Sequence, residues 1–206
     1  MDVRDKLLQA ALRVFEGCGS RGATTRRIAA EAGVNEITLF RHFGSKAALL
    51  NEAISGGAPR PGAPLPAEPR DPAAELLAWA RMQHAGLRRN AALIRTSMGE
   101  MERNPELMRH TAENPRRSHT ELHAYMERLS QAGMIRADVD TYAATAMLMG
   151  SLFADAMGRD MIPDRYPYGE ADAPAKYLEL FLRAIGAEPD AASPAGTPDE
   201  VAGPFS

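Results

Sequence analysis

Two histidines four residues apart, His119 and His123, have the spacing that could bind a metal ion from one face of a helix. Glu127 follows one turn later and could supply a third ligand. The local sequence is HTELH, however, and Glu121 is one position away from where the zinc-protease motif HExxH needs its general base. A solvated or ligand-facing polar face is the better interpretation, and we expect neither a metal ion nor another cofactor.

No other group of side chains has the order or spacing of a catalytic site. Cys18 is the only cysteine, which excludes an intrachain disulfide and a CxxC pair. An ordinary thiol at the end of the first helix is favoured over a redox sensor. The chain also lacks a Ser/His/Asp order and a Gly-rich phosphate loop. We therefore do not expect an enzyme, although a helical enzyme remains the rival from another class.

The most specific pattern lies in residues 24–46, which predict two short helices joined by a tight turn. Thr24 can cap the first helix, because its hydroxyl can accept a hydrogen bond from a free backbone N–H. Gly33 stands where the chain must turn sharply, since glycine adopts a positive φ without strain. Asn35 can cap the second helix. This arrangement predicts a helix-turn-helix, whose second helix is sized for the major groove of DNA.

This stretch resembles the DNA-binding part of the TetR family of transcriptional regulators. The similar segments are TTRRIAAEAGV and TLFRHFGSK, the second leading into ALL. With a helix expected over residues 3–17, the resemblance covers about the first fifty residues. Two positions depart from it. The family usually has tyrosine where this chain has Phe40, and often has an acidic residue where it has Arg27.

The resemblance implies a set of DNA contacts. Arg26 would read a guanine, because its guanidinium fork can meet two acceptors on that base. Glu36 could accept from a cytosine amino group, and Ile37 or Thr38 could meet a thymine methyl. The side chains implied as phosphate clamps are Thr24, Thr25, His42 and Lys46, and Phe40 and Arg41 complete the set.

The charge distribution supports a DNA-binding end on an acidic chain. The net charge is −3, which alone argues against general nucleic-acid binding. Residues 1–50 contain eight Lys/Arg and five Asp/Glu, a charge of +3, so the remaining residues carry −6. A basic module on an acidic body fits phosphate binding at one end of the molecule.

We expect an all-α chain of about nine helices. Residues 1–46 form a three-helix DNA-binding domain, here called the head. Residues 47–70 are expected to hold two connecting parts. The first is a fourth helix, which Ser45 can cap and which mechanically connects the head to the rest of the chain. The second is a Pro/Gly-rich linker. Residues 71–186 form a helical effector-binding and dimerisation domain, here called the body. The tail, residues 187–206, is expected to be disordered because it is rich in Ala, Pro, Asp and Gly.

The resemblance also implies two sites in the body. An apolar effector pocket would be lined by soft or aromatic side chains: Trp79, Met82, Met98, Met101, Met108, Tyr125, Met126, Met147 and Phe153. A homodimer would form through the last two helices, where small residues four apart allow close approach and an apolar stripe follows. The interface would use Ala146, Gly150, Ala154, Tyr177, Leu178 and Phe181; packing within one chain is the alternative for each.

These features predict a cytoplasmic, homodimeric regulator of transcription that binds double-stranded operator DNA. We expect a repressor of a palindromic operator, released by a small apolar effector of unknown identity. The alternative is a DNA-binding protein of the same fold that is regulated by a protein partner and has no small-molecule effector. We expect no membrane association, because the longest apolar run, from Tyr142 to Ala154, is too short to span a bilayer.

Overall fold

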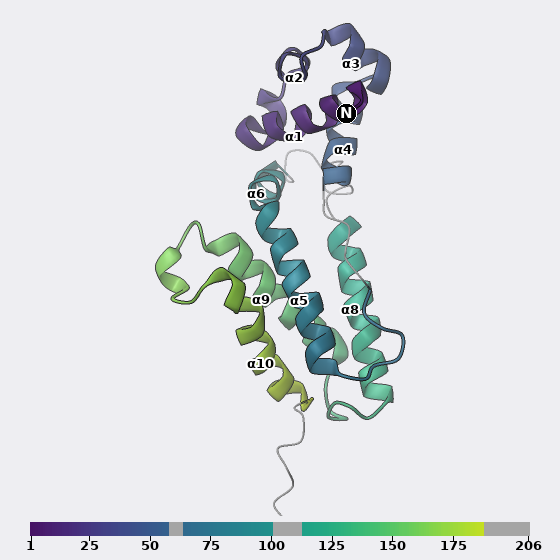
Figure 1. The fold of residues 1–206 in the computed structure, drawn as a ribbon, viewed down its shortest axis with the longest axis vertical. Helices are drawn as coiled ribbons and strands as arrows, with labels where there is room; N and C mark the ends of the chain where they lie inside the picture. The colour runs from purple at the N-terminus through teal and green to yellow at the C-terminus, as the bar shows by residue number, and fades with distance from the viewer. Residues whose placement is uncertain (58–63, 101–112, 188–206) are drawn as a thin grey trace, which may run out of the picture.

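The computed structural model describes residues 1–57, 64–100 and 113–187. Across these ranges the chain forms nine α-helices and two short 3-10 helices, without a strand. The prediction of an all-α chain is therefore confirmed. Figure 1 shows the head at one end of an elongated molecule and the body at the other, with α6 at the end of the body nearest the head.

The three helices of the head pack with α4 (Lys46–Gly57) around one small core. The head helices are α1 (Val3–Gly22), α2 (Thr25–Ala32) and α3 (Glu36–Phe43). Phe15 and Leu39 are fully buried in this core, and burying a side chain of this size contributes about 1.5–3 kcal/mol. Helix α1 extends past its expected end at residue 17, with non-helical backbone at Gly19, where φ is 65°.

The body begins and ends its helices at the capping residues that the sequence supplies. Asp71 caps α5 by accepting from the amide of Ala74, and Asp140 caps α9. Gly186 ends the last helix in the left-handed conformation, with φ of 72°. The helices are α5 (Pro72–Arg89), α6 (Ala91–Glu100), α8 (Glu113–Gln131), α9 (Thr141–Gly158) and α10 (Ala173–Ile185), with η1 (Pro163–Arg165) and η2 (Glu170–Asp172) between the last two.

The main core of the body lies among α5, α8, α9 and α10. It buries Leu76, Trp79, Leu122, Tyr125, Met126, Leu148, Leu152, Leu178 and Phe181, among others. Leu65, from the segment that leads into α5, packs into the same core, and its amide donates to the Glu121 carboxylate on α8 at 2.9 Å. The end of the predicted linker is thus anchored on α8.

Several sequence predictions fall outside the described residues. They are the middle of the linker (58–63), the segment that contains Met101 and Met108 (101–112), and the tail from residue 188 onward. Within the described ranges, no helix combines the length and the hydropathy that crossing a membrane requires.

Candidate DNA-binding and effector sites

The two helices of the helix-turn-helix are held by the caps that the sequence predicts. Thr24 Oγ1 accepts from the amide of Arg27 at 3.3 Å, and Asn35 Oδ1 accepts from the amide of Thr38 at 2.9 Å. Gly33 has φ of 71°, and its amide donates back to the last turn of α2. These contacts satisfy backbone groups at the helix ends and set α3 at an angle to α2.

The outer face of α3 presents an apolar and basic surface. Leu39 points into the core, whereas Ile37 is 77% exposed and Phe40 is 46% exposed. Arg41 and, on α2, Arg26 are also exposed. In Figure 1, α2 and α3 lie at the far end of the head, away from the body. A surface of this composition can meet base edges and phosphates together.

Three of the side chains predicted to contact phosphates have polar atoms that are hydrogen-bonded or buried within the protein. The Thr25 hydroxyl donates to Glu36 Oε2 at 2.9 Å, so its proton is not free for a phosphate. Lys46 Nζ donates to the carbonyl oxygen of Ser20 at 2.8 Å. His42 Nε2 is buried without a hydrogen-bond partner among the described residues. Phosphate contacts by Thr25 and Lys46 would require these side chains to exchange their partners within the protein. Spacing along one helix does not reveal the partners that another segment supplies.

The predicted pocket residues divide between interior and surface. Trp79, Tyr125 and Met126 are buried in the body core, and the half-buried Met82 packs against it. Phe153 lies beside a smaller cluster that contains Ala91. These five side chains remain candidates for a pocket lining.

Met98 and Met147, also predicted as pocket residues, lie at the surface of the protomer. Their side chains are 48% and 49% exposed, whereas Leu148, the next residue after Met147 on α9, is buried. Both helices are apolar on more than one face, so the sequence did not show which methionines point inward. Met101 and Met108 lie outside the described residues.

Polar side chains accompany the interior aromatics, and the sequence analysis missed them. Trp79 Nε1 donates to Glu121 at 3.4 Å, the Tyr125 hydroxyl donates to Glu75, and Ser118 Oγ donates to Gln83 Oε1 at 3.3 Å. Burial and the Glu75 carboxylate raise the pKa of Tyr125, which keeps the phenol protonated. On α5, Glu75, Trp79 and Gln83 are four residues apart, a signal that could have identified this face. Gln83 Nε2 is buried without a partner among the described residues, so a bound molecule could accept from it.

The histidine pair on α8 forms an aromatic stack. His123 lies against Tyr142 with 3.8 Å between ring centroids, and His119 stacks on His123 at 6.1 Å. His123 Nε2 is 3.6 Å from Glu127 Oε1. In the part of the chain that is described, no group of three or more His, Cys, Asp or Glu side chains is arranged to hold a metal ion.

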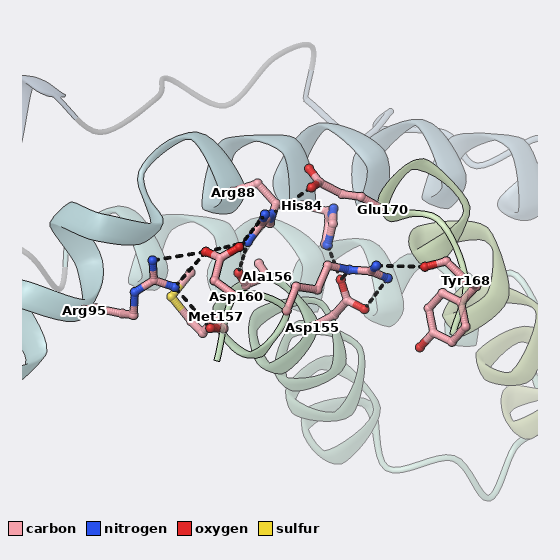
Figure 2. Close-up of polar contacts among 10 residues, drawn as sticks. His84, Arg88, Arg95, Asp155, Ala156, Met157, Asp160, Tyr168 and Glu170 are labelled. Carbon is pink, nitrogen blue, oxygen red and sulfur yellow. Dashed lines mark hydrogen bonds and ion pairs between the residues drawn. The ribbon is translucent and has the colours of Figure 1, made fainter. Parts of the chain in front are cut away.

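A second polar cluster joins α5, α9 and α10, and it also escaped the sequence analysis (Figure 2). Asp155 is wholly buried, and its carboxylate accepts from His84 at 2.6 Å, from Arg159 at 2.7 and 2.9 Å, and from Tyr177 at 2.8 Å. Burial raises the pKa of Asp155, but the hydrogen bonds from Arg159, His84 and Tyr177 outweigh it, leaving this pKa below its ordinary value. The carboxylate is therefore ionised at neutral pH, and His84 Nε2 carries the donated proton.

The predicted dimer surface is exposed on α9 and largely buried on α10. Ala146, Gly150 and Ala154 lie on the solvent side of α9, and a Cβ added to Gly150 would meet nothing within 4 Å. Leu178 and Phe181, in contrast, are each 3% exposed and belong to the core of their own protomer.

The α10 residues named for the dimer thus already pack within the protomer. Tyr177 is half-buried and donates its hydroxyl proton to Asp155, so it too serves the protomer. The exposed apolar side chain on α10 is Leu180. The broad apolar stripe of α10 did not reveal that α5 and α9 of the same protomer pack against this helix.

Comparisons with known proteins agree with this architecture. Residues 7–53 match the model for bacterial regulatory proteins of the TetR family, and residues 75–183 match that for the C-terminal domain of AefR-like transcriptional repressors. The chain is 26% identical over 187 residues to YvkB, an uncharacterised HTH-type transcriptional regulator of Bacillus subtilis (strain 168), covering 89% of this chain and 97% of YvkB.

Solved structures have the same fold. A putative TetR-family regulator from Mesorhizobium loti superposes with a TM-score of 0.69 at 23% identity, over 88% of this chain and 96% of that one. The regulator FadR of Bacillus subtilis, solved in complex with stearoyl-CoA, gives 0.68 at 19% identity, over 89% and 98%. The two domain matches account for most of the described helices in both the head and the body. This chain belongs to the TetR family and is a DNA-binding transcriptional regulator.

Proposed function

We propose that this protein is a ligand-responsive repressor that binds a palindromic operator as a homodimer and is released by a small apolar effector. The observation that carries the proposal is the outer face of α3, where Ile37, Phe40 and Arg41 are exposed on a helix capped at both ends. The repressor assignment is supported by the similarity of residues 75–183 to the C-terminal domain of AefR-like repressors.

Dimerisation is required because one short helix reads only a few base pairs. A two-fold dimer presents two α3 helices to successive major grooves about 34 Å apart, which demands a near-palindromic site. The exposed side of α9 supports this step. Tyr142 and Met147 flank the small residues Ala146, Gly150 and Ala154 there, forming a face on which a second helix could pack closely.

The effector would bind between α5 and α8. Trp79, Tyr125 and Met126 supply apolar surface, and Gln83 supplies an unpaired donor. An apolar molecule with one or a few acceptor groups fits this composition. FadR, which has a similar fold, was solved with stearoyl-CoA, and the acyl chain of that ligand supports an apolar effector part here. Effector binding would shift the population between two head separations, one of which matches the operator.

The DNA arm of the proposal is tested by selecting bound sites from random double-stranded DNA with the full-length protein. We expect the enriched sites to share two inverted half-sites centred about one helical turn apart. Enrichment of a single non-palindromic site would contradict the two-fold arrangement, and absence of enrichment would contradict sequence-specific binding.

The effector arm is tested by native mass spectrometry of protein exposed to cell extract. We expect a retained small molecule that, when added back in pure form, lowers operator affinity. Retention of a protein and of no small molecule would favour regulation by a protein partner instead.

A further inference from the structure

Helix α6 holds the head to the body at three points. Leu93 is buried in the head core beside residues of α1 and α4. Thr96 Oγ1 donates to the carbonyl oxygen of Glu16 at 3.3 Å, and Ser20 Oγ donates to Glu100 Oε2 at 2.5 Å. They give α6 a direct connection to the head beside that of α4, which packs on α1 and α3.

At the end of α6, Glu100 lies against α1 at Gly19. A Cβ on Gly19 would lie 2.6 Å from Glu100 Oε1, and φ at this glycine is 65°. Only a residue without a side chain allows Glu100 to approach α1 so closely in this conformation. The neighbouring Ser20 carbonyl also accepts from Lys46 on α4. The break in α1 is thus the place where α6, α1 and α4 are joined.

The middle of α6 is fastened to the end of α9 by arginines (Figure 2). Arg95 donates to Asp160 Oδ2 through both Nη1 and Nη2, at 3.2 Å each, and to the carbonyl oxygen of Met157 at 3.2 Å. Arg88, near the end of α5, donates to both oxygens of Asp160 at 3.0 and 3.2 Å and to the carbonyl oxygen of Ala156 at 3.0 Å. Cations placed here also complement the negative end of the α9 dipole.

Asp160 is the point that both arginines share. Without its carboxylate, two guanidinium groups would lie close together with only backbone carbonyls and Glu170 as acceptors. Their mutual repulsion would favour moving Arg95, and α6 with it, away from α9. Arg88 is held additionally by Glu170 at 3.0 Å, so Arg95 is the arginine that is freer to leave.

We propose that Asp160 is a positioning residue for DNA binding: by holding Arg95 and Arg88 it seats α6 on the end of α9, and α6 in turn sets the orientation of the head through Glu100, Thr96 and Leu93. Asp160 touches no DNA in this scheme. The consequence is that the helix proposed to form the dimer is coupled directly to the head, by a route separate from the linker. This inference depends on the proposed function only in the experiment that measures operator affinity.

The first experiment compares Asp160→Asn with a matched control, Asp164→Asn. Asp164 is exposed and has no hydrogen bond or ion pair with another described residue, so both variants lose the same charge from the segment between α9 and α10. Hydrogen exchange of the full-length protein without DNA is the primary readout. We expect faster exchange in α6 and around residues 16–20 for Asp160→Asn, no change for Asp164→Asn, and wild-type rates for Asp160→Glu. Equal behaviour of the two Asn variants would overturn the proposal.

The second experiment measures operator affinity for a double-mutant cycle of Asp160→Asn and Glu100→Ala. These positions belong to opposite ends of the α6 connection and do not contact each other. We expect each single variant to weaken binding on the order of tenfold, within the range typical of coupled sites. The double variant should be little worse than either single variant, because both substitutions weaken the same connection between α9 and the head. Effects that multiply would overturn the proposal.

The two experiments separate this inference from the proposed function. If the wild-type protein selects no operator, the proposed function fails, yet the exchange comparison still tests whether Asp160 seats α6. If operator binding is specific and Asp160→Asn leaves both exchange and affinity unchanged, the inference fails and the proposed function stands. A thermal melt of each variant establishes that it is folded at the assay temperature.

Discussion

His84 and Asp155 meet in the interior of the body, where the imidazole Nε2 donates to a carboxylate oxygen 2.6 Å away. Both side chains are essentially inaccessible to solvent. Arg159 and Tyr177 complete the shell of donors around the same carboxylate, and Tyr168 contacts Tyr177 through its hydroxyl at 2.5 Å. One buried anion therefore ties α5, α9 and α10 together, and removing its charge would leave several donors without an acceptor.

Replacing Asp155 with Asn should lower the free energy of unfolding by about 3 kcal/mol at neutral pH. Because the folded pKa of Asp155 is lowered, its stabilising contribution is present above the ordinary pKa of about 4 and is lost as the pH falls through the lowered value. The difference between wild type and variant should therefore shrink below about pH 4. Denaturant unfolding at a series of pH values measures it, with Asp164→Asn as the control. A difference that stays constant to the lowest pH at which the wild type folds would contradict this assignment.

Replacing Arg26 with Ala should weaken operator binding by about 1–3 kcal/mol and relax the preference at one base pair. The exposed guanidinium on α2 has no hydrogen bond or ion pair with the residues that the structure describes, so its loss should not disturb the fold. Fluorescence anisotropy on the selected operator and on single-base variants measures both effects. Arg165→Ala, with the same charge change in the body, should leave affinity unchanged. If Arg26→Ala bound operator DNA and random DNA with the same dissociation constants as the wild type, base reading by Arg26 would be rejected.

Replacing Phe40 with Tyr should strengthen operator binding. The ring is 46% exposed on α3, and a hydroxyl at its end could donate to a phosphate, as in the family pattern. A hydrogen bond to a charged acceptor contributes about 1.5–3 kcal/mol, so the dissociation constant should fall at least about tenfold. The comparison is made at two salt concentrations, since phosphate contacts alter the salt dependence of affinity. Unchanged affinity at both salts would mean that Phe40 does not face a phosphate.

Replacing Gly150 with Leu should yield a monomer that remains folded. The position is exposed on α9 and open to a side chain within the protomer, but leucine would keep a second helix at a distance. Leucine is also the better helix former, by about 0.8 kcal/mol. Sedimentation measures the oligomeric state, and Gly99→Leu, at another open helical position, is the control. A Gly150→Leu dimer as tight as the wild type would remove this face from the interface.

The fluorescence of Trp79 can report ligand binding at the proposed effector site, because Trp79 is the only tryptophan in the chain. Its indole is buried in the body core, with Nε1 bonded to Glu121. An effector between α5 and α8 should therefore change tryptophan emission in a saturable way, and the same concentration range should release operator DNA. The Trp79→Phe variant should lose the emission signal and retain DNA binding. Release of DNA without any change in emission would place the effector elsewhere.

The sequence by itself determined the local structure of this protein. Thr24 and Asn35 cap the helices that their positions predict, and Gly33 adopts the left-handed backbone at the turn between them. Asp71, Asp140 and Gly186 have the same local roles at helix ends in the body. These outcomes depend on contacts within a few residues, which a sequence displays directly. The head was also predictable, because its motif is dense enough to identify the family.

Only the tertiary structure decided which face of each helix is buried and which is exposed to solvent. In α9 and α10, apolar residues surround more than one side, so Met147 and Leu180 turned out exposed while Leu178 and Phe181 turned out buried. Likewise, Asp160 looks like an ordinary surface carboxylate in the sequence, yet it meets Arg88 and Arg95 across more than sixty residues of chain. Such pairings are set by how whole helices pack, and no periodicity within one helix encodes the partner that another helix brings.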